Sequence, residues 1–296
     1  MIKRTLYFGN PAYLKTTNDQ LVVDRPELPA HTVPIEDIGL MVLDHQQITI
    51  SAALMAKLLE NNVALITCNH THHPTGLLLN LDGHTLQSQR FQVQLQSSVP
   101  LRKQLWQQTV EAKISNQAAA LAKRNLENKY LLNLAAKVKS GDAGNLEARA
   151  ALYYWDKFFP ETLQFTRSRE GAPPNNLLNY GYAIVRAMVA RALVGSGLLP
   201  VMGIHHRNQY NAYCLADDIM EPYRPYVDML VYQQVRNHGS FLELSPAMKQ
   251  EFLSLPTQDV QIEEQTSPMM VAITRTTASL AKCFEGSVRK ILYPVI

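Results

Sequence analysis

The sequence has 296 residues, 46% of them apolar, and a formal net charge of +3. A chain of this length can bury a substantial core and has room for two unequal domains. No run reaches the ~18 apolar residues that a membrane-spanning helix needs, and the first residues lack the apolar core of a signal peptide, so we expect a cytoplasmic protein without a membrane partner. The cysteines are far apart and in no CxxC arrangement, which argues against a disulfide framework or a four-cysteine zinc site.

The first part of the chain has a β-like pattern. Short apolar runs separated by turn residues predict strands at 5–8, 20–23, 39–43, 63–66 and 76–79. One helix is expected from Ser51 to Asn61, because Ser51 can cap the first turn and the leucines that follow recur at helical spacing.

After Gly83 the pattern becomes helical. Stretches rich in Ala, Leu, Gln and Lys, and later stretches with helix start and stop signals, predict helices at 86–98, 101–139, 143–158, 175–197, 215–237, 246–254 and 266–288. The expected fold class is therefore α+β in two domains: a small N-terminal β-rich domain over residues 1–84 and a larger all-α domain over residues 85–296.

Positive charge is concentrated in the second part. Residues 1–90 carry 6 positive and 8 negative charges, whereas residues 91–296 carry 22 and 17. Residues 100–139 hold many cations and only two glutamates; the cations are Arg102, Lys103, Lys113, Lys123, Arg124, Lys129, Lys137 and Lys139. A phosphate backbone would be a natural partner for this stretch, and a solvated helix face is the alternative interpretation.

A second cluster combines imidazole and carboxylate side chains. His205 and His206 follow Gly203, and Asp218 and Glu221 follow after a short polar loop. On a helix the two carboxylates would share a face, where they repel each other unless a cation lies between them. Oxygen ligands with one imidazole suit Mg²⁺ or Mn²⁺, ions that activate phosphodiesters.

Residues around this cluster leave its function open. Arg207 and Arg224 flank it, and each can pair with the carboxylates or contact a phosphate. The alternative is a set of ordinary surface carboxylates and loop histidines that bind nothing. Glu147, early in an expected helix, offers a third ligand, and its spacing does not show whether it faces the histidines.

Four motifs occur in a specific order along the chain. They are Gly144-Asn145-Leu146-Glu147-Ala148-Arg149-Ala150, the segment 168–182, Gly203-Ile204-His205-His206 and Asp218-Ile219-Met220-Glu221-Pro222-Tyr223-Arg224-Pro225. Together they resemble the family of CRISPR-associated spacer-acquisition integrases, and the similarity covers essentially the whole chain. The resemblance implies that the N-terminal domain makes dimer and companion contacts and that the helical domain is catalytic.

The resemblance also implies a set of catalytic metal ligands, Glu147, His206 and Glu221, with Mg²⁺ or Mn²⁺ as the cofactor. His206 is preferred to His205 because it stands three residues after Gly203, and Asp218 corresponds to the family's auxiliary acid. His205 and Arg224 are further auxiliary candidates. Candidate contacts to the DNA backbone are Lys103, Lys123, Arg124, Lys137, Lys139 and Arg207.

The implied activity is the insertion of short foreign DNA fragments into the CRISPR repeat array, by attack of a 3′-hydroxyl on a phosphodiester. The implied partners are double-stranded DNA, a second copy of the chain in a homodimer, and a small ferredoxin-like companion subunit in a heterohexamer. Residues 205–213 resemble the type II clade, so its large effector nuclease is a further candidate partner. The alternatives are a catalytically silent DNA-binding scaffold and a repair nuclease for branched DNA.

Overall fold

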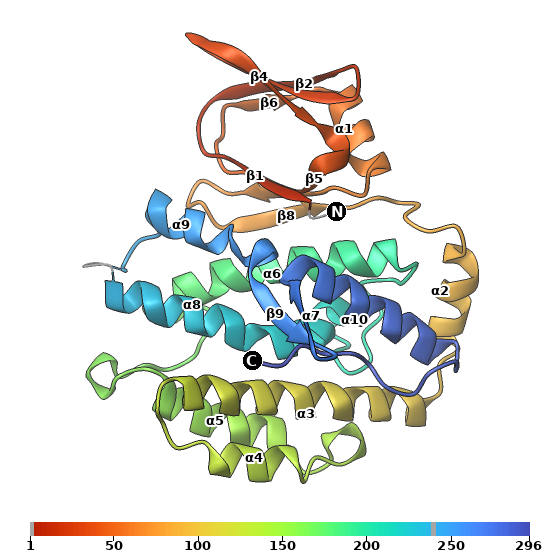
Figure 1. The fold of residues 1–296 in the computed structure, drawn as a ribbon, viewed down its shortest axis with the longest axis vertical. Coiled ribbons are helices and arrows are strands. Elements are labelled where there is room, and N and C mark those ends of the chain that lie inside the picture. Colours follow the sequence, from red (N-terminus) through yellow and green to blue (C-terminus); the bar gives the residue numbers. More distant parts are fainter. Residues whose placement is uncertain (1–2, 238–240) are drawn as a thin grey trace.

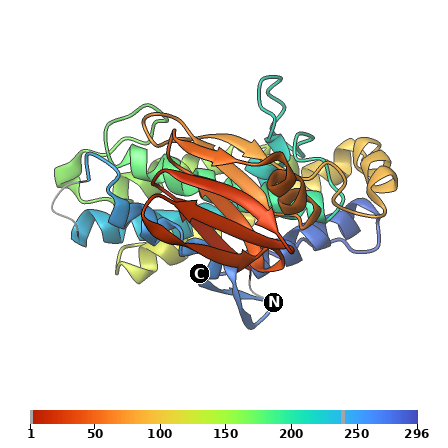
Figure 2. The ribbon, with the colours of Figure 1, turned by 90° about the horizontal axis from the view of Figure 1, so that it is seen from above.

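The computed structural model describes residues 3–237 and 241–296, which form a β-rich N-terminal part on a larger helical part (Figure 1). Seen from above, the sheets lie across the middle of the helical layer (Figure 2). The last N-terminal strand, β8, ends at Leu78, and the first helix of the helical part, α2, begins at Gln87. The predicted fold class is confirmed.

Within the described residues, the N-terminal strands form two four-stranded sheets, in the orders β1-β5-β7-β8 and β4-β3-β2-β6. Their bounds are β1 Arg4–Phe8, β2 Ala12–Thr17, β3 Gln20–Arg25, β4 Leu28–Pro34, β5 Ile38–Leu43, β6 Ile48–Ile50, β7 Ala64–Cys68 and β8 Pro74–Leu78. The sequence did not predict β2, β4 and β6. Helix α1, Ala52–Glu60, was predicted, and the Ser51 hydroxyl accepts the Leu54 N–H at its start.

Strand β5 lies between two cores. It pairs in parallel with β1 and β7 and is buried on both faces. Because successive side chains of a strand point to opposite faces, Leu40 and Val42 pack with the helices, whereas Met41 packs with α1 and the second sheet. Strand β7 repeats the arrangement with Ile66 on the helical side and Leu65 on the other. The N-terminal part is therefore docked on the helices through shared strands.

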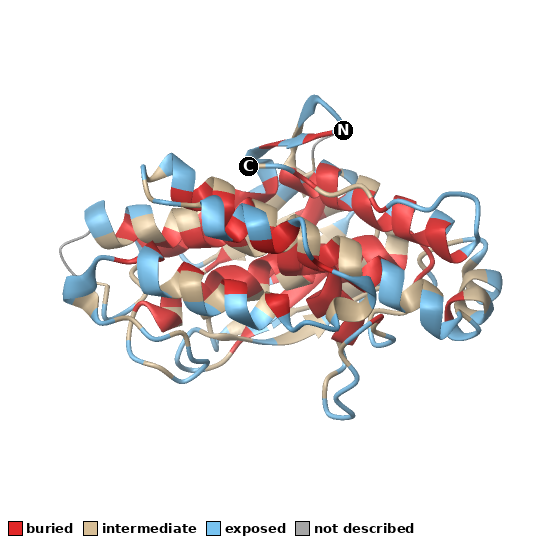
Figure 3. Ribbon diagram, turned by 90° about the horizontal axis from the view of Figure 1, so that it is seen from below, coloured by how far each residue is buried: buried red, intermediate tan, exposed pale blue. Residues whose placement is uncertain are grey.

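The helical part is built around the buried helix α6. The helix bounds are α2 Gln87–Leu95, α3 Val99–Lys123, α4 Lys129–Ala135, α5 Leu146–Phe158, α6 Asn175–Gly195, α7 Cys214–Met220, α8 Arg224–Asn237, α9 Pro246–Phe252 and α10 Met269–Phe284, with short 3₁₀ turns η1 Ile35–Asp37, η2 Ser140–Asp142, η3 Glu161–Leu163, η4 Glu221–Tyr223 and η5 Leu255–Thr257. Among the described helices, α6 is long and apolar enough to cross a membrane, but 83% of its apolar window is buried in the protein. Buried residues run along the inner faces of the helices (Figure 3).

Three local features differ from the predicted helices. The stretch 101–139 is interrupted between α3 and α4, where Asn125 has a positive φ of 57°, a conformation that ends helices. The stretch 215–237 is interrupted by η4, because Pro222 has no N–H to continue the helix. An antiparallel hairpin of β9 Asp259–Ile262 and β10 Gln265–Pro268 adds two strands to the helical part.

Candidate active site

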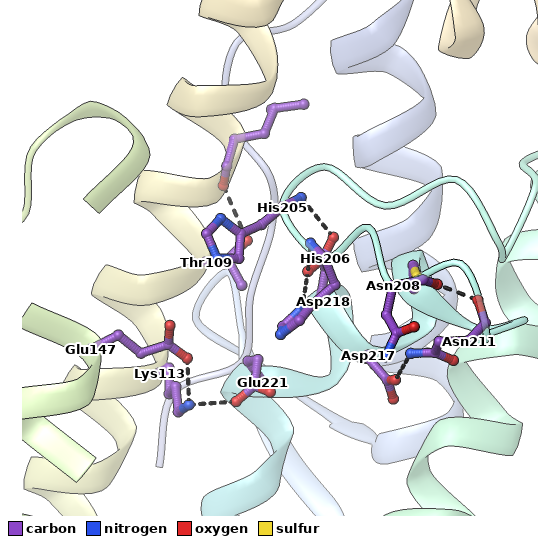
Figure 4. Close-up of polar contacts among 12 residues, drawn as sticks. Thr109, Lys113, Glu147, His205, His206, Asn208, Asn211, Asp217, Asp218 and Glu221 are labelled. Atoms are coloured by element: carbon purple, nitrogen blue, oxygen red, sulfur yellow. Dashed lines mark hydrogen bonds and ion pairs between the residues drawn. The ribbon is translucent and has the colours of Figure 1, made fainter. Parts of the chain in front are cut away.

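Two carboxylates from distant elements converge on one ammonium group (Figure 4). Lys113 extends from α3, and its Nζ lies 2.7 Å from Glu147 Oε1 and 2.6 Å from Glu221 Oε2. Glu147 is held in the first turn of α5, where the Asp142 carboxylate accepts the Leu146 and Glu147 N–H groups. The structure therefore brings together two of the three predicted ligands.

At Glu221 and Lys113, the pairing of opposite charges shifts the pKa more strongly than burial does. The side chains of Lys113 and Glu221 are only 13% and 6% exposed. Burial alone would raise the pKa of the Glu221 carboxyl, but the charges of Arg224 and Lys113 lower it to about 2. Burial would likewise discharge Lys113, yet Glu221 and Glu147 raise the pKa of its ammonium. The Glu221 carboxylate and the Lys113 ammonium are therefore both charged.

Asp218 positions the third predicted ligand, His206. The fully buried Asp218 carboxylate accepts the backbone N–H groups of His205 and His206, at 2.9 and 3.2 Å, and lies 2.5 Å from His206 Nδ1. This bond raises the pKa of the His206 imidazole, and the nearby Glu221 and Glu147 carboxylates add to the rise. With Nδ1 engaged, Nε2 is the ring nitrogen left to bind a ligand.

The loop that carries His206 depends on Gly203. A Cβ at residue 203 would lie 2.3 Å from the His206 carbonyl oxygen and 2.8 Å from Asp218 Oδ2. The ring of His205 stacks on Trp106, with centroids 4.1 Å apart and planes 4° apart. Asp218 is therefore a support for His206, and the His205 ring packs on the core.

The residues present fit a divalent ion in their chemistry. Among residues 3–237 and 241–296, no three His, Cys, Asp or Glu side chains lie close enough together to hold a metal ion. Glu221 Oε2 is nevertheless buried without a hydrogen bond of proper geometry, since Lys113 approaches it only as an ion pair. Two carboxylates and one free imidazole nitrogen are a donor set that Mn²⁺ and Mg²⁺ accept.

The remaining predicted residues lie in different environments. Arg224 is partly buried, with Nε 2.9 Å from Glu221 Oε1 and its guanidinium over the Tyr182 ring. Arg124 lies over the Tyr232 ring, and Arg207 lines a cavity of about 390 Å³ beside His206. The exposed predicted lysines are Lys103, Lys123, Lys137 and Lys139.

An arginine-lined cavity and the location of Lys113 were not indicated by the sequence. A cavity of about 540 Å³ is lined by Arg167, Arg169, Arg186 and Arg224. A smaller cavity of about 150 Å³ is lined by Lys113 and Glu221 and shares Arg167 and Arg224 with it. All four of these arginines lie outside the basic stretch 100–139, so the charge count did not indicate them; Arg224 was noted only as a neighbour of the acidic cluster.

Asparagines on α6 and an aspartate hold the arginines of the larger cavity in place. Arg167 donates to the Oδ1 atoms of Asn175 and Asn179, at 2.7 and 2.9 Å. Arg186 Nε donates to Asp217 Oδ1 at 2.6 Å. The guanidinium groups are therefore oriented by the fold, an arrangement that suits recognition of phosphate.

Comparisons with known proteins agree with this fold. The family model described as "CRISPR associated protein Cas1" matches residues 6–241. A CRISPR-associated endonuclease Cas1 of Neisseria meningitidis serogroup C (strain 8013) is 37% identical over 281 residues, which cover 94% of this chain and 91% of the relative.

Two solved structures have the same fold. A casposase bound to integration product aligns with a TM-score of 0.78 and 19% identity, over 98% of this chain and 92% of the casposase chain. A chain of a Cas6-RT-Cas1–Cas2 complex aligns with a TM-score of 0.76 and 20% identity, over 98% of this chain and 36% of that longer chain. These two structures show the shared fold, and the family match and the Neisseria relative indicate the class of CRISPR-associated endonucleases. The chain belongs to the Cas1 family.

Proposed function

We propose that this protein is a divalent-metal-dependent DNA strand-transfer enzyme that inserts short DNA fragments into a CRISPR repeat array. Glu147, His206 and Glu221 are the proposed ligands of Mg²⁺ or Mn²⁺. The observation that carries the proposal is the convergence of two carboxylates on one point, with the ring of His206 oriented beside them by Asp218.

The proposed reaction gives separate roles to the ion, to Asp218 and to Arg224. When bound, the ion would polarise a phosphoryl oxygen at the site of attack by a 3′-hydroxyl. Asp218 fixes the orientation of the His206 ring, and Arg224 holds the Glu221 carboxylate while its guanidinium lies over Tyr182. Water in place of the 3′-hydroxyl would give nicking by the same residues.

The arginine-lined cavity is the proposed seat of the DNA backbone next to the carboxylates. Its lining includes four arginines and one acidic residue, Glu170; Arg186 and Arg224 are ion-paired with carboxylates, whereas Arg167 is oriented by neutral asparagines. The exposed lysines of α3 and of residues 137–139 are further proposed contacts for the DNA backbone. Phosphate contacts of this kind supply affinity without sequence specificity, and they weaken as salt increases.

The proposed assembly contains two further kinds of partner. We infer a homodimer and a small ferredoxin-like companion subunit in a heterohexamer, both contacted through the proposed domain of residues 1–84. The Cas6-RT-Cas1–Cas2 complex contains a chain of the same fold, which supports the proposal that this chain has a companion subunit. Membership of the type II clade, with an effector nuclease as an additional partner, is part of the same proposal.

The test combines the purified protein, the companion subunit, a 3′-hydroxyl duplex and a supercoiled repeat plasmid, with Mg²⁺, Mn²⁺ or chelator. Joining should require the ion and be lost in Glu221→Gln, which keeps the shape of the side chain, and persist in the surface control Asp156→Asn. Binding without joining or nicking would favour the silent scaffold. Cleavage of branched DNA without preference for the repeat junction would favour the repair nuclease.

A further inference from the structure

Lys113 has no role in the reaction described above, although its ammonium contacts two of the three proposed metal ligands, Glu147 and Glu221. It contacts Glu147 on α5 and Glu221 on η4 at ion-pair distances, and its side chain is 13% exposed. Arg224 also acts on this group: its Nε lies 2.9 Å from Glu221 Oε1, whereas Lys113 contacts Oε2. Two carboxylates and two cations therefore balance each other without any metal ion.

A divalent ion bound by the same carboxylates would upset this balance. It would bring two positive charges next to an ammonium that already contacts both proposed acidic ligands. A carboxylate oxygen that points at the ammonium must turn or exchange partners before it can bind the ion. Metal binding and the Lys113 ion pairs are therefore in competition for Glu147 and Glu221.

The side chain of Lys113 lines a cavity into which it can move when it is displaced. Lysine is a point charge on a flexible stem of four carbons, whereas arginine is a rigid fork. Lys113 lines the cavity of about 150 Å³, and this cavity shares Arg167, Tyr182 and Arg224 with the arginine-lined cavity. A released ammonium can turn toward the place where the proposed function seats a DNA phosphate.

We propose that Lys113 is an internal counter-cation of the metal site: it holds Glu147 and Glu221 together in the metal-free protein, and a divalent ion has to displace it. This inference rests on the proposed function, because it takes Glu147 and Glu221 as metal ligands. Lys113 is then a positioning residue that keeps the site assembled between reactions and lowers its affinity for the ion.

The test measures metal binding and stability without DNA, so it does not depend on activity. Mn²⁺ is titrated calorimetrically into the full-length protein and into Lys113→Met, Lys113→Arg and Lys282→Met, the last being an exposed lysine on α10. Lys113→Met should bind Mn²⁺ at least about tenfold more tightly, which corresponds to about 1.4 kcal/mol. Lys113→Arg keeps the charge and should bind Mn²⁺ no more tightly than the unchanged protein does. Lys282→Met should bind Mn²⁺ with the same affinity as the unchanged protein.

Thermal unfolding supplies the second measurement. Lys113→Met should melt at a lower temperature than the unchanged protein in chelator, because the buried Glu221 and the partly buried Glu147 lose a cation, and Mn²⁺ should restore most of the difference. If Lys113→Met does not fold in chelator, the double variant Lys113→Met/Glu147→Gln removes the repulsion. It should recover stability that the single variant lost, and no recovery would contradict the counter-cation role.

The outcomes separate this inference from the proposed function. Mn²⁺ binding that is lost in Glu221→Gln but unchanged or weakened in Lys113→Met would overturn the inference and leave the metal site in place. A loss of stability in Lys113→Met without tighter Mn²⁺ binding would mean that Lys113 is only an ordinary ion-pair partner. This result would also overturn the inference. Absence of Mn²⁺ binding in every variant would overturn both.

Discussion

Asp228 is a buried carboxylate whose titration should be visible in the stability of the protein. It lies on α8, is 1% exposed, and accepts hydrogen bonds from the Tyr154 and Tyr182 hydroxyls. Burial raises the pKa of its carboxyl from 3.8 to about 7, against the lowering effect of the tyrosines and of Arg224. The folded protein therefore binds a proton at Asp228 over a pH range in which the unfolded chain has lost it.

The sign of the effect follows from this raised pKa. The stabilisation is fully present below the unfolded pKa of 3.8 and is lost as pH rises through about 7. At 1.36 kcal/mol per pH unit, the loss between about pH 5 and about pH 8 is about 2 to 3 kcal/mol. Asp228→Asn keeps an amide that can bond both tyrosines and removes the titration.

The effect is measured by urea unfolding of the unchanged protein and of Asp228→Asn at several pH values between about 5 and about 8. The difference between their free energies of unfolding should shift by about 2 to 3 kcal/mol in favour of the variant as pH rises, since all other titrating groups cancel. The exposed Asp156→Asn on α5 should show no such trend. A difference that stays constant, or that shifts in favour of the unchanged protein, would refute the reasoning.

Three further changes test other features of the site. Asp218→Asn removes the carboxylate that orients His206, so calorimetry should show Mn²⁺ affinity about 10- to 100-fold weaker; unchanged affinity would contradict the supporting role. Gly203→Ala puts a methyl group against the His206 carbonyl oxygen, so chemical unfolding should show a loss of about 1 to 3 kcal/mol, and equal stability would mean that the loop yields easily. Arg169→Ala should lower the slope of log affinity for duplex DNA against log salt concentration by about 1, and a slope unchanged from that of the full protein would exclude a phosphate contact.

Local patterns predicted the elements that depend on neighbouring residues. The cap of α1 by Ser51 and the apolar runs of β5 and β7 follow from spacing alone. Strand β4 was missed because most of its residues are exposed, so they show no apolar alternation. The β9-β10 hairpin was missed because its turn is formed by Glu263 and Glu264, which adopt positive φ without the glycine or asparagine that marks such turns.

The motifs indicated residues of the candidate site but not their contacts. Glu147, His206 and Glu221 were chosen by resemblance, and their roles as ligands stay a prediction. Lys113 was counted with a basic surface, whereas the structure buries it among carboxylates. Composition gives the number of charges on a helix, but the direction of each depends on how α3 packs against α5 and η4, which are distant in sequence.

The shared strands β5 and β7 have a consequence for how the chain folds. Leu40, Val42 and Ile66 belong to the same apolar cluster as the helices, so a helical part produced alone would lack one wall of its own core. Insertion of a single residue in β5 would turn the side chains that follow it to the opposite face of the strand. Both apolar cores would lose packing contacts at the same time. The N-terminal and helical parts should therefore melt in one cooperative transition rather than in two.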